Sequence, residues 1–90
     1  MMNLVHWRLM VAVADVRNLT HAAAATGMTQ SAASQAIAQL ESSLGFPVLV
    51  RERRHISVTA LGEQVIEHAR TMLVQLNAIR ELADESRGCL

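Results

Sequence analysis

The sequence predicts an all-α fold that carries one small β-hairpin. Aromatic residues, which sheets favour, make up only 2% of the chain, although 51% of its residues are hydrophobic, and its frequent Ala and Leu are good helix formers. Apolar residues also recur at spacings of three and four along three segments, and a short β-branched run between Pro47 and Thr59 interrupts this pattern once. Ninety residues are enough for one domain with a helical extension.

The first two helices are expected over residues 4–15 and 19–26. The predicted buried stripe of the first helix consists of Leu4, Trp7, Met10, Val11 and Ala14. Asn18 is a typical N-cap for the second helix, because its side chain can accept a hydrogen bond from an early backbone N–H. Gly27 can take a positive φ and end this helix. We therefore expect a short helix followed by a tight turn.

The third helix is expected over residues 30–44, with Thr29 as its N-cap. Its predicted buried stripe consists of Ala33, Ile37, Leu40 and Leu44. Gly45 favours a stop at this point, and Pro47 prevents the helix from continuing. The second and third helices, with the turn between them, have the elements of a helix-turn-helix.

A change of period after Pro47 predicts a hairpin. Val48–Val50 and Ile56–Val58 are short and rich in β-branched residues. They flank a polar, Arg-rich segment over Arg51–His55, which is expected to form the tip.

A long final helix is expected over residues 60–86, with Thr59 as its cap and Glu63 at the spacing of a weak capping box. Its apolar seam, which is close to a heptad pattern, consists of Val65, Ala69, Met72, Leu76, Ile79 and Ala83, with Ile66 and Leu73 beside it. A helix of about 40 Å is too long for the preceding domain to cover, so a second copy of the chain is the expected partner. The predicted division is a helix-turn-helix domain with its hairpin over residues 1–58, called the reading domain below, and a dimerisation helix with its tail over residues 59–90.

The charge is unevenly distributed along a chain whose formal net charge is +0. Residues 1–57 carry five Arg against three acids, whereas residues 58–90 carry three Arg against five acids. Three of the arginines, Arg51, Arg53 and Arg54, lie within four consecutive residues. A local cluster of basic side chains is better evidence for a negatively charged binding partner than the net charge of the chain is.

Several classes of protein are disfavoured by what the sequence lacks. Its single cysteine, Cys89, excludes an internal disulfide and a zinc site built from cysteines. The four histidines lie on different predicted elements, and no nucleophile–base pair or phosphate-binding loop can be named. We therefore expect no metal, no cofactor and no enzymatic activity. No apolar run approaches the roughly 20 residues that span a bilayer, so a cytoplasmic protein is expected.

Two groups of side chains are candidates for binding nucleic acid. On the third helix, the face opposite the buried stripe presents Gln30, Ser31, Ser34, Gln35 and Ala38. Small and amide side chains near a helix N-terminus suit a major groove, where Gln can pair with adenine. The hairpin tip, which suits the narrow, electronegative minor groove, presents Arg51, Arg53, Arg54 and His55. Each group alone is more simply explained as solvated surface, but the two together favour DNA.

The chain also resembles a known family through a series of short motifs. These motifs are Thr20–Ala23, Gly27–Ile37, Leu40-Glu41, Leu44-Gly45, Leu49–Arg51, Arg54 and Val58–Gly62. Their combination closely resembles the N-terminal domain of LysR-type transcriptional regulators over about residues 2–85. The resemblance implies a winged helix-turn-helix followed by a long linker helix that pairs with a second copy into an antiparallel homodimer. It also implies sequence-specific binding of double-stranded DNA at an interrupted inverted repeat.

The resemblance implies roles for individual residues. Contacts in the major groove are implied for Gln30, Ser31, Ser34 and Gln35. Contact with phosphate is implied for Asn18, Thr20, Thr29 and Arg51, of which the first three commonly cap helices as an alternative. The wing residues expected in the minor groove are Arg53, Arg54 and His55, with Arg54 as the family's wing arginine.

Two departures from the family pattern bear on these expectations. Arg17 lies where the family usually has Gly, so we expect a strained or reshaped turn between the first two helices. The family also normally carries a C-terminal effector-binding domain of two α/β lobes, which these residues do not include, so a small-molecule effector is expected only with such a domain. Two alternatives stay open: a truncated dimerising module that pairs with full-length regulators, and the DNA-binding domain of a molybdate-sensor-type regulator, which matches less well.

Overall fold

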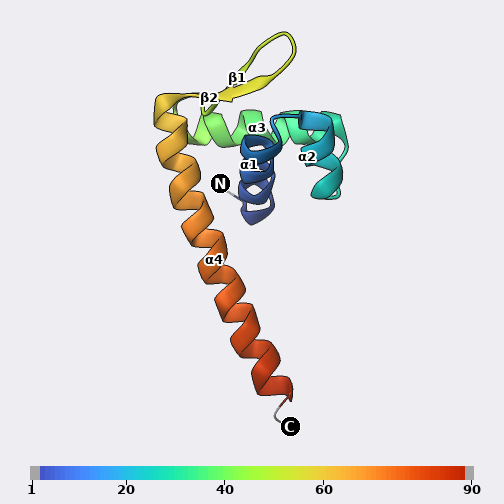
Figure 1. Cartoon of the computed structure of the whole chain (residues 1–90), viewed down its shortest axis with the longest axis vertical. Coiled ribbons are helices and arrows are strands. Elements are labelled where there is room, and N and C mark those ends of the chain that lie inside the picture. The colour runs from blue at the N-terminus through green and yellow to red at the C-terminus, as the bar shows by residue number, and fades with distance from the viewer. Residues whose placement is uncertain (1–2, 89–90) are drawn as a thin grey trace.

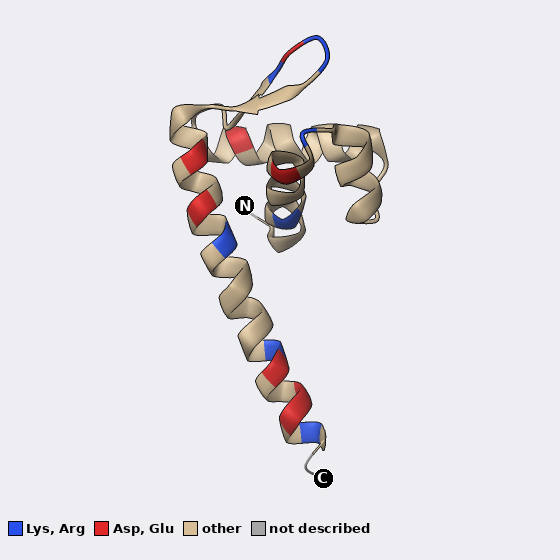
Figure 2. Cartoon of the chain, viewed as in Figure 1, with Lys and Arg blue, Asp and Glu red and all other residues tan. Residues whose placement is uncertain are grey.

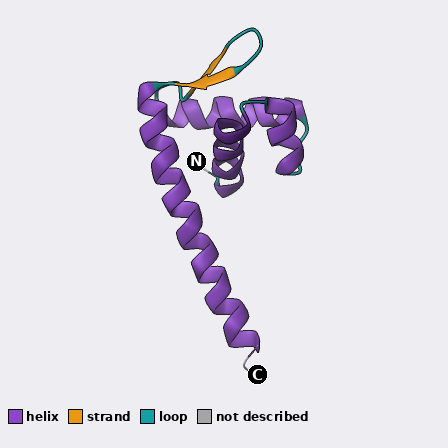
Figure 3. Ribbon diagram, in the orientation of Figure 1, coloured by secondary structure: helices purple, strands orange, loops and turns teal. Residues whose placement is uncertain are grey.

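The structure, a computed structural model, describes residues 3–88. Its elements are α1 (Leu4–Val16), α2 (Leu19–Ala25), α3 (Gln30–Leu44), β1 (Leu49–Arg51), β2 (Ile56–Val58) and α4 (Ala60–Gly88). The first three helices and the hairpin gather at one end of α4, and the rest of α4 projects away from them (Figure 1). The predicted all-α class with one small hairpin is therefore confirmed (Figure 3).

All predicted boundaries agree with the structure to within two residues, and four elements differ slightly from their predicted bounds. Helix α1 ends at Val16, one residue later than predicted. The first strand begins and ends one residue later than predicted, because Arg51 pairs with Ile56 in the antiparallel ladder. Helix α2 ends at Ala25, since Thr26 is its C-cap. Helix α4 continues to Gly88 rather than stopping at residue 86.

Side-chain and glycine caps define the helix ends as expected. The side chains of Asn18 and Thr29 accept hydrogen bonds from the backbone N–H groups of residues three positions on, at 3.0 and 3.1 Å. These bonds satisfy donors that a helix N-terminus otherwise leaves unpaired. Gly27 and Gly45 take positive φ values of 71° and 85° where α2 and α3 end.

Helix α1 is the centre of the core, and its predicted buried face was partly wrong. Leu9 and Val13 are fully buried although they lie off the predicted stripe, whereas Leu4 is 43% exposed. The reason is that α1 contacts α2, α3, α4 and β2, so its buried surface is wider than one stripe. On α3 the correction is smaller: Ala36 is buried and Leu44 is only partly buried.

The start of α4 is fastened to the hairpin. The Thr59 hydroxyl accepts a hydrogen bond from the Gly62 N–H at 2.9 Å, and the Thr59 N–H donates to the Val48 carbonyl. Since that N–H is already paired, the predicted capping role of Glu63 is not needed, and its side chain lies toward Arg17 instead. Gly62 is buried so closely against Val48 that an added Cβ would overlap the Val48 carbonyl oxygen.

Among residues 3–88, nothing covers the far part of α4. Ile66 and Ala69 are buried against the other helices, but Ile79 and Leu82 are 63% and 66% exposed. The prediction that the preceding domain cannot cover this helix is therefore confirmed. No helix within residues 3–88 is both long enough and apolar enough to cross a membrane.

Candidate nucleic-acid interface

The exposed face of α3 is the first part of the candidate interface. Gln30, Ser31 and Gln35 are exposed and Ser34 is partly exposed, as predicted from the pattern of the helix. Gly27 makes the turn from α2 into α3 with its positive φ. The Thr26 hydroxyl donates to the Ala22 and Ala23 carbonyls, which ties the end of α2 to its own last turn. The helix-turn-helix unit therefore presents a polar helix N-terminus to solvent.

Hydrogen bonds between elements order two of these polar side chains. The Thr20 hydroxyl on α2 donates to the Gln30 Oε1 atom at 3.4 Å. The Arg51 guanidinium, at the end of β1, donates to the Ser34 hydroxyl at 3.3 Å. These contacts join α2, α3 and β1 at one surface.

The hairpin tip is the second part. Residues 51–55 are all exposed, and they carry three arginines and one acid. The loop that carries these arginines, blue in Figure 2, extends away from α4. The His55 Nε2 atom lies 3.0 Å from the Glu52 carboxylate, and the Glu52 N–H donates to the His55 carbonyl, so the loop is closed by its own contacts.

A polar groove of about 300 Å³ connects the two parts. It is lined by the start of α2, by Gln30 at the start of α3 and by the hairpin from Arg51 to Ile56, together with Arg17. The structure thus brings Gln30 and the hairpin residues together, and the bond from Arg51 adds Ser34, whereas Ser31 and Gln35 do not line the groove. Asn18 and Thr20 lie in this lining, and Thr29 caps α3 beside it.

The predicted dimer seam divides into two parts. Ala69 is 3% exposed and so is buried within its own chain, and Val65 and Leu76 are partly buried. Met72, Ile79 and Ala83 are exposed. An apolar groove of about 470 Å³ runs beside this seam, between the start of α1 and the middle of α4. It is lined by Leu4, Trp7, Val65, His68, Ala69 and Met72.

Sequence reasoning missed several surface residues next to that seam. Trp7 is partly buried rather than central to the core, and it lines the apolar groove. Leu61 and Leu82 are exposed on α4. The helical period places Leu61 on the same side of the helix as Met72 and Ile79, several turns earlier, and Leu82 one turn beyond Ile79. A search for a wider apolar face on this helix, rather than for a strict heptad pattern, would have included these residues.

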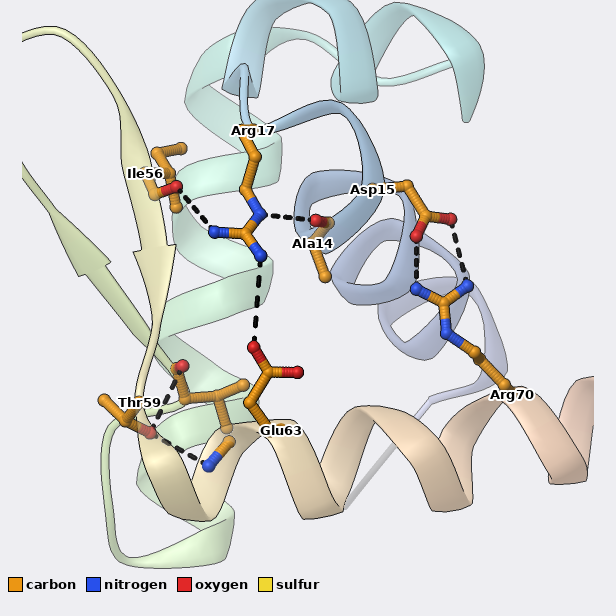
Figure 4. A network of polar contacts seen from close by, with 9 residues as sticks. Ala14, Asp15, Arg17, Ile56, Thr59, Glu63 and Arg70 are labelled. Atoms are coloured by element: carbon orange, nitrogen blue, oxygen red, sulfur yellow. Dashed lines mark hydrogen bonds and ion pairs between the residues drawn. The ribbon is translucent and has the colours of Figure 1, made fainter.

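A network of polar contacts, which was not predicted from the sequence, ties the end of α1 to α4 (Figure 4). The Arg70 guanidinium binds both carboxylate oxygens of Asp15, one of them at 3.1 Å. Arg70 holds the pKa of Asp15 below its ordinary value, chiefly through these hydrogen bonds. The Arg17 guanidinium donates to the Ala14 carbonyl at 2.6 Å and to the Ile56 carbonyl at 3.3 Å, and it lies 3.9 Å from the Glu63 carboxylate.

Arg17 confirms the expectation of a strained turn. Its φ is 59°, and it is the only residue other than glycine with a positive φ within residues 3–88. Within the same residues, no three His, Cys, Asp or Glu side chains gather as metal ligands would. Cys89 lies outside the described residues.

Comparison with known proteins identifies the family. The model of the family described as "Bacterial regulatory helix-turn-helix protein, lysR family" matches residues 4–63. The HTH-type transcriptional regulator IlvR of Caulobacter vibrioides is 37% identical over 99% of this chain. The match spans only 31% of the length of IlvR.

Solved structures agree with this result. The BenM_DBD/benA site 1 DNA complex has a TM-score of 0.86 at 28% identity, covering 93% of this chain and 94% of that one. Full-length OxyR C199D from Pseudomonas aeruginosa has a TM-score of 0.89 at 29% identity, covering 94% of this chain and 29% of that one. The predicted winged helix-turn-helix with a linker helix is therefore confirmed, and the chain belongs to the LysR family of bacterial regulatory helix-turn-helix proteins.

Proposed function

We propose that this chain is the DNA-binding part of a bacterial transcriptional regulator and that it binds an interrupted inverted repeat in double-stranded DNA as a homodimer. The observation that carries this proposal is the single polar surface formed by the start of α3 and the Arg-rich hairpin. The similarity to a protein solved as a DNA complex supports it. Residues 1–58 serve as the reading domain and residues 59–90 as the linker helix with its tail. A cytoplasmic location and the absence of enzymatic activity belong to the same proposal.

Helix α3 lies in the major groove in this proposal. Gln30, Ser31 and Gln35 are exposed near its N-terminus, where recognition helices contact base edges. Ser34 is oriented by Arg51, which lies close enough to the helix to reach phosphate beside it. Asn18, Thr20 and Thr29 lie at the starts of α2 and α3, where backbone N–H groups can bind phosphate oxygens.

The hairpin lies in the neighbouring minor groove. Arg53, Arg54 and His55 are exposed there, and the two arginines carry positive charge. A narrow minor groove has an enhanced negative potential that attracts such side chains. Because the whole chain has no net charge, this local charge is the part available for attraction to DNA.

Two substitutions test these contacts on a duplex selected from random DNA by the wild-type chain. Gln30→Ala and Arg54→Ala should each weaken specific binding by about 1–3 kcal/mol, roughly 5- to 150-fold in Kd. Gln39→Ala, in the later part of the exposed face of α3, and Arg87→Ala, near the end of α4, are matched controls that should bind as wild type does. Fluorescence anisotropy at fixed salt gives the four affinities. Equal affinities for the contact variants and their controls would overturn the proposed contacts.

A second function is favoured by one observation, the exposure of Ile79 and Leu82 on α4. A chain with this surface could pair with full-length regulators of the same family and act as a protein-interaction module. Size-exclusion chromatography of the chain mixed with a full-length relative, together with selection of binding sites from random DNA, distinguishes this function from DNA binding as a homodimer. Formation of mixed dimers without selection of any DNA sequence would favour the module, and homodimers that select an inverted repeat would favour the reading domain.

A further inference from the structure

The end of α1 holds α4 at two points along its length. Asp15 is bound by Arg70, and Arg17 lies against Glu63. Glu63 and Arg70 are seven residues, or two turns, apart, so they lie on the same face of α4 about 10 Å apart along its axis. Two contacts on one face resist a tilt of the helix, which a single contact allows. We call these four residues the α1–α4 brace (Figure 4).

Arg17 extends the brace to the hairpin. Its guanidinium donates to the Ile56 carbonyl on β2 and to the Ala14 carbonyl on α1, and it approaches Glu63 on α4. It does so from a left-handed backbone conformation, with φ at 59°. Glycine takes this conformation without steric cost and arginine does not. The side chain therefore joins three elements from a position where the backbone alone favours glycine.

The other restraints on α4 act on the same first three turns of the helix. Its first turn is fastened by Thr59 and Gly62, and Ile66 and Ala69 are buried against the neighbouring helices. Beyond Leu76 every described residue of α4 is exposed. From Gly62 to Gly88 the helix acts as a lever of about 40 Å. A tilt of about 5° moves its far end by about 3.4 Å, which is the rise of one base pair.

We propose that the α1–α4 brace sets the angle between the linker helix and the reading domain, and thereby the half-site spacing that the homodimer selects. The inference rests on the proposed function and adds positioning residues to it. Asp15, Glu63 and Arg70 do not line the polar groove, so they act on DNA selection without touching the DNA. In a dimer that pairs through α4, the angle of this helix determines how far apart the two copies of α3 lie.

One of the two contacts of the brace, between Asp15 and Arg70, can be removed without unfolding the chain. The side chains of Asp15 and Arg70 are about half exposed, and exposed ion pairs contribute little to the free energy of unfolding. The test variant is Asp15→Asn combined with Arg70→Gln. Arg80→Gln is the matched control, because Arg80 is exposed on the same helix beyond the reading domain. A charge swap, Asp15→Arg with Arg70→Asp, restores the ion pair in the opposite direction.

The first measurement is the affinity for inverted repeats whose spacer varies in steps of one base pair. The wild type, the Arg80→Gln control and the charge swap should prefer one spacing. The Asp15→Asn/Arg70→Gln variant should lose most of that preference, or shift it by one or more base pairs, with unchanged affinity for a single half-site. If this variant keeps the spacing preference of the wild type, the proposed role of the brace is wrong, and the proposed function is unaffected. A wild type that selects no repeat would count against the proposed function alone.

The second measurement needs no DNA. Spin labels on Ala24→Cys in α2 and Glu85→Cys near the end of α4, with Cys89→Ser, report the distance between the reading domain and the far end of the lever. Labelled chains are diluted with unlabelled ones so that only distances within one chain are seen. The Asp15→Asn/Arg70→Gln variant should shift or broaden the distance distribution by about 3 Å or more, which corresponds to the tilt of about 5° over the lever length. An identical distribution would overturn the proposal whatever the DNA result.

Discussion

At the scale of single residues, Arg17 shows how a side chain can hold an unfavourable backbone conformation. The backbone at this position has a φ of 59°, and the guanidinium donates hydrogen bonds to two carbonyls, at 2.6 and 3.3 Å. A net contribution of about 0.5–1.5 kcal/mol for each such bond is comparable to the roughly 1–2 kcal/mol that a left-handed conformation costs an ordinary residue. The two effects nearly cancel.

This balance predicts different results for two substitutions. Arg17→Ala removes the contacts and keeps the strain, whereas Arg17→Gly removes both. The glycine variant should therefore be more stable than the alanine variant by about 1 kcal/mol, and within about 1 kcal/mol of the wild type. Urea denaturation at one protein concentration gives the three free energies of unfolding. Equal stabilities of the two variants would show that residue 17 does not adopt a positive φ.

At the scale of elements, the features predicted correctly from the sequence depend on residues close together in the chain, and those missed depend on distant residues. The bounds of α3 were predicted correctly because Thr29 caps its start and Gly45 caps its end through contacts within one turn. The buried face of α1 was partly wrong, because α1 packs against four other elements and no single periodicity describes that. The ion pair between Asp15 and Arg70 joins residues 55 positions apart. No spacing rule could have found it.

The candidate site shows the same distinction. Its residue types and their exposure on α3 and the hairpin followed from helical period and local charge. The bond from Arg51 to Ser34 did not, since it depends on how β1 is placed against α3. The pairing of Glu41 with the Val48 and Leu49 N–H groups, at 2.6 and 3.0 Å, supplies part of that placement and was also beyond the sequence.

Also at the scale of elements, the junction of the hairpin with α4 is tightly packed, and Gly62→Ala should disturb it. The added Cβ would overlap the Val48 carbonyl oxygen and crowd the Thr59 hydroxyl. Because both belong to the cap of α4, we expect a loss of about 1–3 kcal/mol in the free energy of unfolding. Gly88→Ala is the control, since nothing lies near its Cβ position. Urea denaturation should find the control unchanged or slightly more stable, and a Gly62→Ala variant as stable as this control would contradict the packing described.

At the scale of the whole molecule, the structure combines a cluster of short elements with a long helix whose described residues beyond Leu76 are all exposed. Its longest extent is 53 Å, against 25 and 22 Å in the other directions. The apolar side of α4 and the groove beside Trp7 are continuous. Covering this surface is the task of the second copy in the proposed homodimer.

Charged substitutions on the exposed stripe should therefore separate the homodimer. Ile79→Glu combined with Leu82→Glu introduces two acidic side chains that would have to be desolvated in an interface. Sedimentation equilibrium should show monomers for this variant and dimers for the wild type. Asn77→Glu is the control, because a residue two positions before Ile79 lies on the opposite side of the helix. Dimers of unchanged affinity in the double variant would place the interface elsewhere.

The most direct test of DNA reading is the ratio of two affinities measured for the wild-type chain near physiological salt. One is the affinity for an inverted repeat selected from random duplex, and the other is the affinity for the same bases in scrambled order. The polar surface of α3 and the hairpin predicts a ratio of about 1,000 or more, as specific DNA-binding proteins show. A ratio near one, with binding that disappears as salt rises, would mean that only charge attraction acts and would contradict sequence-specific reading.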